Sequence, residues 1–179
     1  MKDSKLLSPR QRELLFDGII KAADSYEILI IEPWEVDKAV ESTTSNLNWL
    51  EADKTIEILN RLKADTAIID SPSRNKARYG SYIRKGLKQD TELKVEHKAD
   101  LNYPSVSAAS ILAKVTRDRE IGKLKEKIGI NFGSGYPSDP LTVSFLKNNY
   151  QSYPNIFRKS WESYKAVAMK KTQKRLLEY

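Results

Sequence analysis

The chain has 179 residues, with 31 Lys and Arg against 24 Asp and Glu, which gives a formal charge of +7. It contains no cysteine and a single histidine, which excludes disulfides, thiolate metal sites and multi-histidine zinc sites. The length and the 40% hydrophobic content fit one globular domain. The positive charge favours an anionic partner, although a merely soluble basic surface explains it equally well. No apolar run is typical of a signal peptide or a membrane span, so we expect a cytoplasmic protein that is not bound to a membrane.

The first half of the chain alternates between helix and strand patterns. Apolar residues recur with helical spacing from Ser8 to about Ala23, where Ser8-Pro9 is typical of a helix start. Tyr26–Ile31 is a β-branched apolar run that predicts a strand buried on both faces, and Pro33 begins a short helix. A long amphipathic helix is predicted from Asn48 to Lys63, followed by a strand over Thr66–Asp70.

The second half continues the alternation. A strand is predicted over Thr91–His97, and helices from about Pro104 to Lys127, from Pro140 to about Lys147 and from about Trp161 to the end. The pattern predicts one α/β domain over residues 1–150, with residues 151–179 as a helical extension of the same domain.

Residues 73–86 form a basic run interleaved with Tyr79 and Tyr82. Guanidinium and ammonium groups pair with phosphates, so the run fits a nucleic-acid backbone. A solvated helix or loop face is an equally good interpretation.

The helix predicted from Pro104 has two distinct faces. One is expected to pack closely against a sheet through Ala109, Leu112, Ala113 and Val115. The other is a polar stripe made by Ser107, Ser110, Lys114 and Arg117. Hydroxyls and cations along one stripe suit a site that handles phosphate.

Two acids occupy positions typical of catalytic carboxylates. Asp70 ends a predicted strand, and Asp100 follows the next strand and precedes the long helix. Carboxylates at the carboxyl edge of a sheet hold divalent ions that assist phosphodiester cleavage. Such residues also serve as helix caps or turn residues, which is the alternative for this pair.

Four segments together resemble the ribonuclease HII family, most closely its archaeal branch. They are Asp3-Ser4-Lys5-Leu6-Leu7-Ser8-Pro9, Ala67-Ile68-Ile69-Asp70-Ser71-Pro72, the run from Lys98 to Glu120 with its Ser107-Ala108-Ala109-Ser110 core, and Phe132-Gly133-Ser134-Gly135-Tyr136-Pro137-Ser138-Asp139-Pro140. The resemblance implies an RNase H-like fold with a mixed sheet flanked by helices. It also implies a metal-dependent endonuclease, using Mn²⁺ or Mg²⁺, that cuts the RNA strand of RNA/DNA hybrids and nicks 5′ to ribonucleotides in duplex DNA.

The family's four metal-binding acids are only half represented. Asp70 and Asp100 match the last two, whereas the opening Asp-Glu-Ala-Gly-Arg-Gly segment that supplies the first two is absent from the sequence. Three interpretations stay open: a fragment of a longer chain that lacks the first strands, a natural truncation that has become an inactive nucleic-acid-binding remnant, or replacement by another acid. Candidates for the last are Asp3, Glu32 and Asp118.

Substrate contacts are implied for several other positions. Tyr136 matches a tyrosine that senses the 2′-hydroxyl, although an aromatic packed under a glycine-rich turn is the alternative. Ser4 and Lys5 match a phosphate-contacting segment, with a disordered terminus as the alternative. Lys114 and Arg117 fit phosphate contacts or ion pairs within their own helix.

The C-terminus resembles a sliding-clamp-binding peptide. Gln173, Leu176 and Tyr179 have the required spacing, and one helical turn brings Leu176 and Tyr179 together for insertion into a groove. A basic amphipathic helix end is the alternative. We expect a monomer that acts on hybrids and ribonucleotide-containing DNA.

Overall fold

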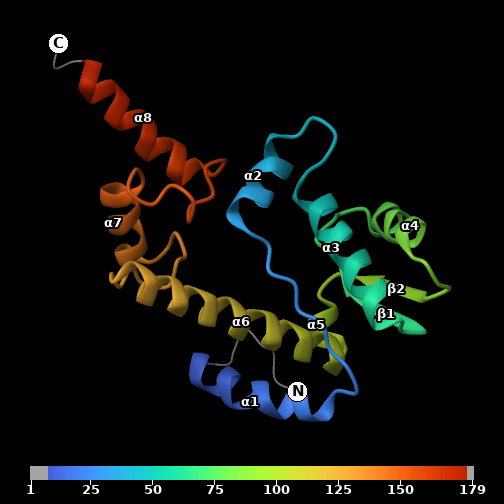
Figure 1. The fold of residues 1–179 in the computed structure, drawn as a ribbon. Coiled ribbons are helices and arrows are strands. Elements are labelled where there is room, and N and C mark those ends of the chain that lie inside the picture. Colours follow the sequence, from blue (N-terminus) through green and yellow to red (C-terminus); the bar gives the residue numbers. More distant parts are fainter. Residues whose placement is uncertain (1–7, 177–179) are drawn as a thin grey trace. The chain divides into compact units, whose positions relative to one another are not determined.

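A computed structural model describes residues 8–176, which fall into two compact units (Figure 1). Of the described residues, the first unit comprises residues 8–30 and 48–117, and the second comprises residues 31–47 and 118–176. None of the helices in the described part is long and apolar enough to cross a membrane.

The first unit is built around two strands and the helix that connects them. It contains α1 (Pro9–Ala22), α3 (Leu47–Leu62), β1 (Thr66–Asp70), α4 (Lys76–Gly86), β2 (Glu92–Glu96), α5 (Ala99–Asn102) and the first part of α6 (Pro104–Ile128). The strands pair in parallel, from Thr66 opposite Glu92 to Asp70 opposite Glu96. A parallel pair needs a crossover connection, and α4 supplies it.

The start of α1 follows from its sequence. The Ser8 hydroxyl accepts a hydrogen bond from the Gln11 N–H at 3.2 Å, and the Gln11 side chain accepts one from the Ser8 N–H at 2.8 Å. Pro9 fits the first turn because its missing N–H has no partner there in any helix. This reciprocal capping confirms the predicted helix start.

The core of the first unit lies between the strand pair and the two helices α3 and α4. Its buried members are Ala52, Leu59, Ala67, Ile69, Tyr79 and Ile83. Side chains alternate along a strand, so the face of β1 that buries Ala67 and Ile69 is opposite the face that carries Asp70. A Cβ at Gly80 would lie 3.1 Å from Val95, so glycine allows α4 to pack closely on β2.

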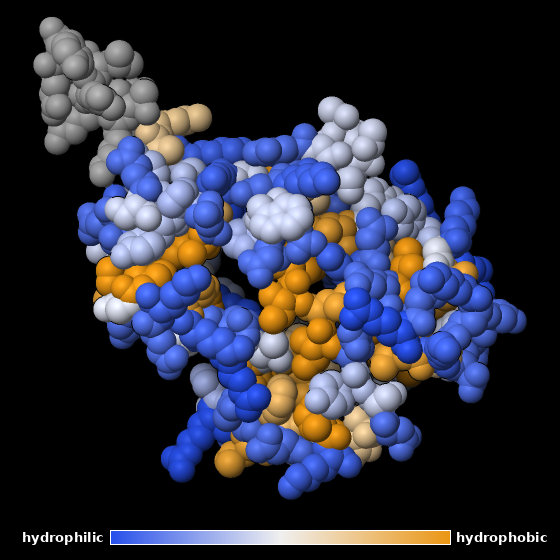
Figure 2. All heavy atoms as spheres, viewed as in Figure 1, coloured by the Kyte–Doolittle hydropathy of each residue, from blue (hydrophilic) through white to orange (hydrophobic). Residues whose placement is uncertain are grey.

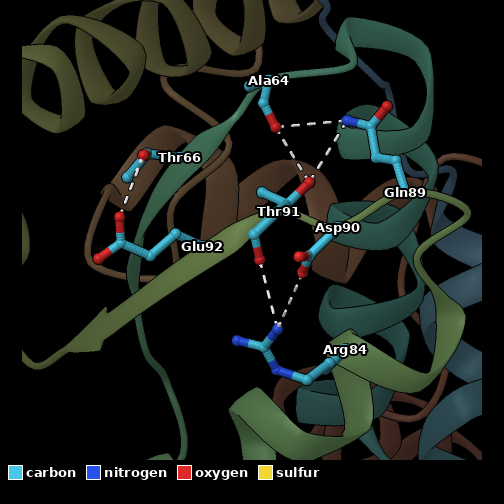
Figure 3. Close-up of polar contacts among 7 residues, drawn as sticks. All are labelled: Ala64, Thr66, Arg84, Gln89, Asp90, Thr91 and Glu92. Atoms are coloured by element: carbon cyan, nitrogen blue, oxygen red, sulfur yellow. Dashed lines mark hydrogen bonds and ion pairs between the residues drawn. The ribbon is translucent and has the colours of Figure 1, made fainter.

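The amino end of the strand pair is closed by a small polar network (Figure 3). The buried Thr91 donates its hydroxyl to the Ala64 carbonyl at 3.0 Å, and the Gln89 amide donates to both groups at 3.3 Å. On the exposed face of the pair, Thr66 donates to Glu92 at 3.3 Å. These contacts support the register of β1 and β2, and the same register pairs Asp70 with Glu96 at the carboxyl end.

The second unit contains α2 (Pro33–Glu41), the remainder of α6, α7 (Pro140–Asn149) and α8 (Glu162–Leu176). Its aromatic centre is formed by Phe132, Phe145, Tyr153, Phe157 and Tyr164. Asp37 of α2 fastens the turn before α8: its carboxylate accepts hydrogen bonds from the Lys159 N–H, the Ser160 N–H and the Ser160 hydroxyl at 2.9, 2.9 and 2.7 Å.

One predicted strand is wrong. Residues 26–31 form no strand, and the sheet of the described residues has two parallel strands instead of a mixed set. A strand forms only when a partner satisfies its backbone, and residues 8–176 offer this run no neighbouring strand. The run therefore has no regular secondary structure and is partly exposed, with Ile30 51% exposed.

The packing face predicted for the long helix is also partly wrong. The buried residues of α6 are Ser107, Ile111, Leu112 and Val115, whereas Ala109 and Ala113 are exposed. Positions 107, 111 and 115 follow one another at steps of four and define the buried face. Small size favoured the alanines in the prediction, but helical phase places them away from that face.

Candidate functional site

The carboxyl edge of the strand pair brings Asp70 beside the segment that carries Asp100. Asp70 is the last residue of β1, and its Oδ1 accepts a hydrogen bond from the Ala99 N–H at 3.3 Å. Asp100, the next residue, is only 8% exposed, whereas Asp70 is exposed. The structure thus joins the two acids that the sequence singled out, although they lie 30 positions apart in the chain.

Asp100 lies within a short helix and not in the connection before it. Lys98 adopts a left-handed conformation (φ 55°, ψ 40°) that turns the chain out of β2 and into α5. Ala99 is fully buried, and its carbonyl accepts a hydrogen bond from the Tyr103 N–H at 2.9 Å. A small buried residue and a closed turn fix the backbone on both sides of the acid.

Glu96 is a third carboxylate at this edge, and the sequence analysis missed it. It pairs with Asp70 across the two strands, and paired residues of parallel strands project from the same face. The Tyr103 hydroxyl donates to Glu96 Oε1 at 2.9 Å, and this hydrogen bond is the main cause that raises the pKa of Tyr103. Alignment of the two predicted strands by their ends would have placed Glu96 opposite Asp70.

The negative charge of Asp70 also reaches α3. Burial, followed by the charge of Asp70, raises the pKa of Glu51 above its ordinary value. No sequence pattern distinguishes this residue, because an acid in an amphipathic helix normally lies on a solvated face. Asp70 therefore stands in a locally acidic environment that includes groups from α3 and β2.

The chemistry of these donors fits a hard divalent cation. Carboxylate oxygens are the ligands that Mg²⁺ and Mn²⁺ prefer, and a cation relieves the repulsion between neighbouring acids. Asp70 and Asp100 are the residues best placed to bind one. In the part of the chain that the structure describes, no three His, Cys, Asp or Glu side chains are close enough together to form a larger ligand set.

Tyr136 lies in the second unit, in a turn that is tightly fixed by hydrogen bonds. Gly133 and Gly135 have positive φ values of 77° and 75°. The Gly135 N–H donates to the Thr142 hydroxyl at 2.9 Å, and that hydroxyl donates to the Phe132 carbonyl at 2.8 Å. The turn is therefore held at both ends by Thr142 of α7.

The tyrosine of this turn is not a packing residue. Tyr136 is 49% exposed, whereas Phe132 is buried and its ring centre lies 5.0 Å from that of Phe145. The alternative of an aromatic packed under the turn thus describes Phe132 and is wrong for Tyr136. The exposed phenol is accessible to a ligand.

The carboxylate of Asp139 stabilises the same turn. It accepts hydrogen bonds from the Ser134 N–H at 2.7 Å and from the Leu141 N–H at 2.9 Å, which also caps α7. The hydrogen bond from the Ser134 backbone is the main cause that lowers the pKa of Asp139. Its ionised form is therefore the one that stabilises the turn.

The remaining predicted residues are distributed along the chain. Lys114 and Arg117 are partly buried on α6 and interact with other groups of the protein. Gln173 and Leu176 lie in the last turns of α8. Ser4, Lys5 and Tyr179 lie outside the described residues.

Comparison with known families gives one consistent result. A family model described as Ribonuclease HII matches residues 1–164. The curated ribonuclease HII of Pyrococcus horikoshii is 46% identical over 172 residues, which cover 93% of this chain and 76% of that protein. The ribonuclease HII of Thermococcus sibiricus is 44% identical over 188 residues and covers 100% of this chain and 82% of that protein.

Solved structures agree with the sequence relatives. The crystal structure of the ribonuclease H2 from Pyrococcus horikoshii has a TM-score of 0.83 and 46% identity, over 94% of this chain and 80% of that one. A structure of the PCNA:RNase HII complex from Archaeoglobus fulgidus has a TM-score of 0.80 and 38% identity, over 93% of this chain and 79% of that one. The predicted α/β fold is confirmed by both.

Proposed function

Because this chain belongs to the ribonuclease HII family and is thereby a ribonuclease H, we propose that it hydrolyses the RNA strand of RNA/DNA hybrids and nicks duplex DNA 5′ to embedded ribonucleotides. The observation that carries the proposal is the hydrogen bond from the Ala99 N–H to Asp70, which places the strand-end acid beside Asp100. We also propose that the protein is a cytoplasmic monomer and that it acts in the replication and repair of DNA.

Asp70 and Asp100 are the residues that would hold Mg²⁺ or Mn²⁺. A bound divalent ion supplies an activated water and neutralises the charge that develops on the leaving oxygen. Asp70 is exposed and therefore accessible to the substrate. The buried Asp100 is held in place by the hydrogen-bonded turn around Ala99. Neighbouring Glu96 adds negative charge to the same edge and keeps its orientation through Tyr103.

Recognition of the substrate is assigned to residues outside the acid pair. The exposed Tyr136 phenol stacks on a sugar and hydrogen-bonds the 2′-hydroxyl that distinguishes RNA from DNA. Lys114 and Arg117, together with Ser4 and Lys5, contact backbone phosphates.

A second proposal concerns a protein partner. Gln173, Leu176 and Tyr179 bind a sliding clamp, and the similarity to a ribonuclease HII whose structure was solved with PCNA favours this assignment. Removal of the Tyr179 ring in Tyr179→Ala should abolish clamp binding without a change in cleavage of a short oligonucleotide. Clamp binding that survives this change would contradict the assignment.

The cleavage reaction is tested with a DNA duplex that carries one ribonucleotide, in Mg²⁺ or Mn²⁺ and with chelator. We expect cutting 5′ to the ribonucleotide that requires the metal and falls by about two orders of magnitude or more in Asp70→Asn. Asp90→Asn is the matched control. Asp90 comes just before β2, at the amino end of the strand pair, whereas Asp70 lies at the carboxyl end. Hybrid binding without cleavage, unchanged in Asp70→Asn, would instead identify an inactive nucleic-acid-binding remnant.

A further inference from the structure

The longest acid-free stretch around the sheet begins directly after Asp70. Residues 71–89 contain no Asp or Glu, and they contain six cations. The cations are Arg74, Lys76, Arg78, Arg84, Lys85 and Lys88, all with exposed side chains. This stretch includes the whole of α4 and gives it a strong positive charge.

One of these cations has a structural task. Arg84 Nη1 lies 3.5 Å from the Thr91 carbonyl and 4.0 Å from Asp90 Oδ1, so it joins α4 to the amino end of β2 (Figure 3). The positive charge of Arg84 therefore has a structural role within the fold and needs no ligand to account for it. Among residues 8–176, the cations on the solvent side form no comparable ion pair.

Two of those cations, Arg78 and Lys85, share one face of the helix with Ser81. Arg78, Ser81 and Lys85 follow one another at steps of three and four, and all are exposed, whereas Tyr79 and Ile83 on the opposite side are fully buried. The rise of an α-helix separates Arg78 from Lys85 by about 10 Å along the axis. Figure 2 shows hydrophilic side chains gathered around α4, at the right of the view.

Arg78 is held in place by the neighbouring helix. Its guanidinium carbon lies 5.4 Å from the centre of the Trp49 ring of α3. Trp49 in turn packs on Tyr82 with ring centres 4.6 Å apart, and the Tyr82 hydroxyl donates to Asp53 at 2.7 Å. A guanidinium that stacks on an aromatic ring keeps its edge N–H groups available for a phosphate.

We propose that the solvent face of α4, through Arg78, Ser81 and Lys85 with Arg74 at its amino end, binds the sugar-phosphate backbone of the duplex whose RNA is cut at Asp70. The proposal rests on the proposed function and assigns it a backbone-binding surface. A nucleic acid fits better than a membrane, because Tyr79 and Ile83 of α4 are buried in the core and the solvent face carries mainly charged and polar side chains, whereas a helix that enters a bilayer needs an exposed apolar face. Contacts to phosphates carry no sequence information, so this surface binds all sequences alike.

The test measures equilibrium binding of a labelled RNA/DNA hybrid to the full chain in chelator, where cleavage is prevented, at several salt concentrations. We expect Arg78→Glu combined with Lys85→Glu to weaken binding at least about tenfold at low salt and to reduce the salt slope by about 2, because each lost phosphate contact removes about 0.9 from it. Lys85→Glu alone should give about half of that reduction, a change in the slope of about 1.

Lys21→Glu is the matched control, since Lys21 is likewise an exposed cation in the last turn of a helix of the same unit. It should change the slope little. Equal losses in Lys21→Glu and Lys85→Glu would overturn the proposal, because they would reflect overall charge. If the Arg78 change disturbs folding, as a thermal melt would show, Lys85→Glu decides alone.

Different results would contradict the proposed surface on α4 and the proposed function. If the unchanged protein binds and cleaves hybrids but the double variant binds equally well, the surface on α4 is wrong and the proposed function stands. If the unchanged protein neither binds nor cleaves hybrids, both are wrong.

Discussion

The Asp139 carboxylate lies against Gly133, at the position that a side chain of residue 133 would occupy. A Cβ on Gly133 would be 2.5 Å from Asp139 Oδ2, closer than side chains tolerate, and the residue already has a φ of +77° that favours glycine. The same carboxylate accepts the Ser134 N–H at 2.7 Å. The absence of a side chain at Gly133 therefore allows Asp139 to hold the turn that presents Tyr136.

Gly133→Ala should move this turn and impair substrate recognition. We expect kcat/KM on a duplex with a single ribonucleotide to fall by about tenfold or more, because small displacements of a positioning group are costly. Gly129→Ala is the control: Gly129 has a similar φ of +73° but no atom within 4 Å of its Cβ position. Equal losses in both variants would mean that backbone strain alone is responsible.

Asp37 should make the stability of the second unit depend on acid pH. Burial raises its pKa, but hydrogen bonds from Ser160 and Lys159 outweigh that effect and place the pKa below its ordinary value of 3.8. A carboxyl group with a lowered folded pKa stabilises the protein fully above the unfolded pKa, and this contribution is lost as the pH falls through the folded pKa. The loss should therefore occur below about pH 4.

Asp37→Asn removes the charge but keeps the size of the side chain. At neutral pH we expect the free energy of unfolding to fall by about 1–2 kcal/mol, since hydrogen bonds to a charged acceptor are lost at a partly exposed site. The acid limb of the stability curve should also become flatter, as measured by denaturant unfolding between pH 2.5 and about 7. A variant with the same pH dependence as the parent would show that Asp37 is not the group that titrates.

The strands and helices could be predicted largely because their signals are local. Thr66–Asp70 was predicted with the observed bounds, and Ser8 with Pro9 fixed the start of α1. The strand predicted over residues 26–31 failed because strand formation depends on a partner that the local pattern cannot supply. Helical phase, and not residue size, decided which side of α6 became buried.

The candidate site could be predicted only in part, for a similar reason. Asp70 and Asp100 stand at the ends of recognisable elements, so each was visible in the sequence. Glu96 becomes significant only once the register pairs it with Asp70, and Glu51 only once α3 packs near the same acid. The solvent-facing positions of Arg78 and Lys85 likewise require knowledge of which side of α4 enters the core.

Glu96→Gln should weaken metal activation without loss of the fold. The substitution keeps an oxygen that can accept from Tyr103 but removes a negative charge opposite Asp70. Groups around metal ligands typically change metal affinity by about 10- to 100-fold, so we expect half-maximal activity at a correspondingly higher Mg²⁺ concentration. Glu92→Gln, at the other end of the same strand, is the control and should leave the Mg²⁺ dependence unchanged.

Ser107→Ala should stabilise the protein. Ser107 is 2% exposed, and its hydroxyl has no hydrogen-bond partner among residues 8–176. A buried hydroxyl without a partner costs about 1–3 kcal/mol, so its removal should raise the free energy of unfolding by about 1 kcal/mol. Alanine also has the higher helix propensity, and Ser81→Ala, at an exposed position within α4, measures that contribution separately. A gain in Ser107→Ala no larger than in Ser81→Ala would show that the hydroxyl is satisfied, and a loss of cleavage in a stabilised variant would give Ser107 a direct role in the site.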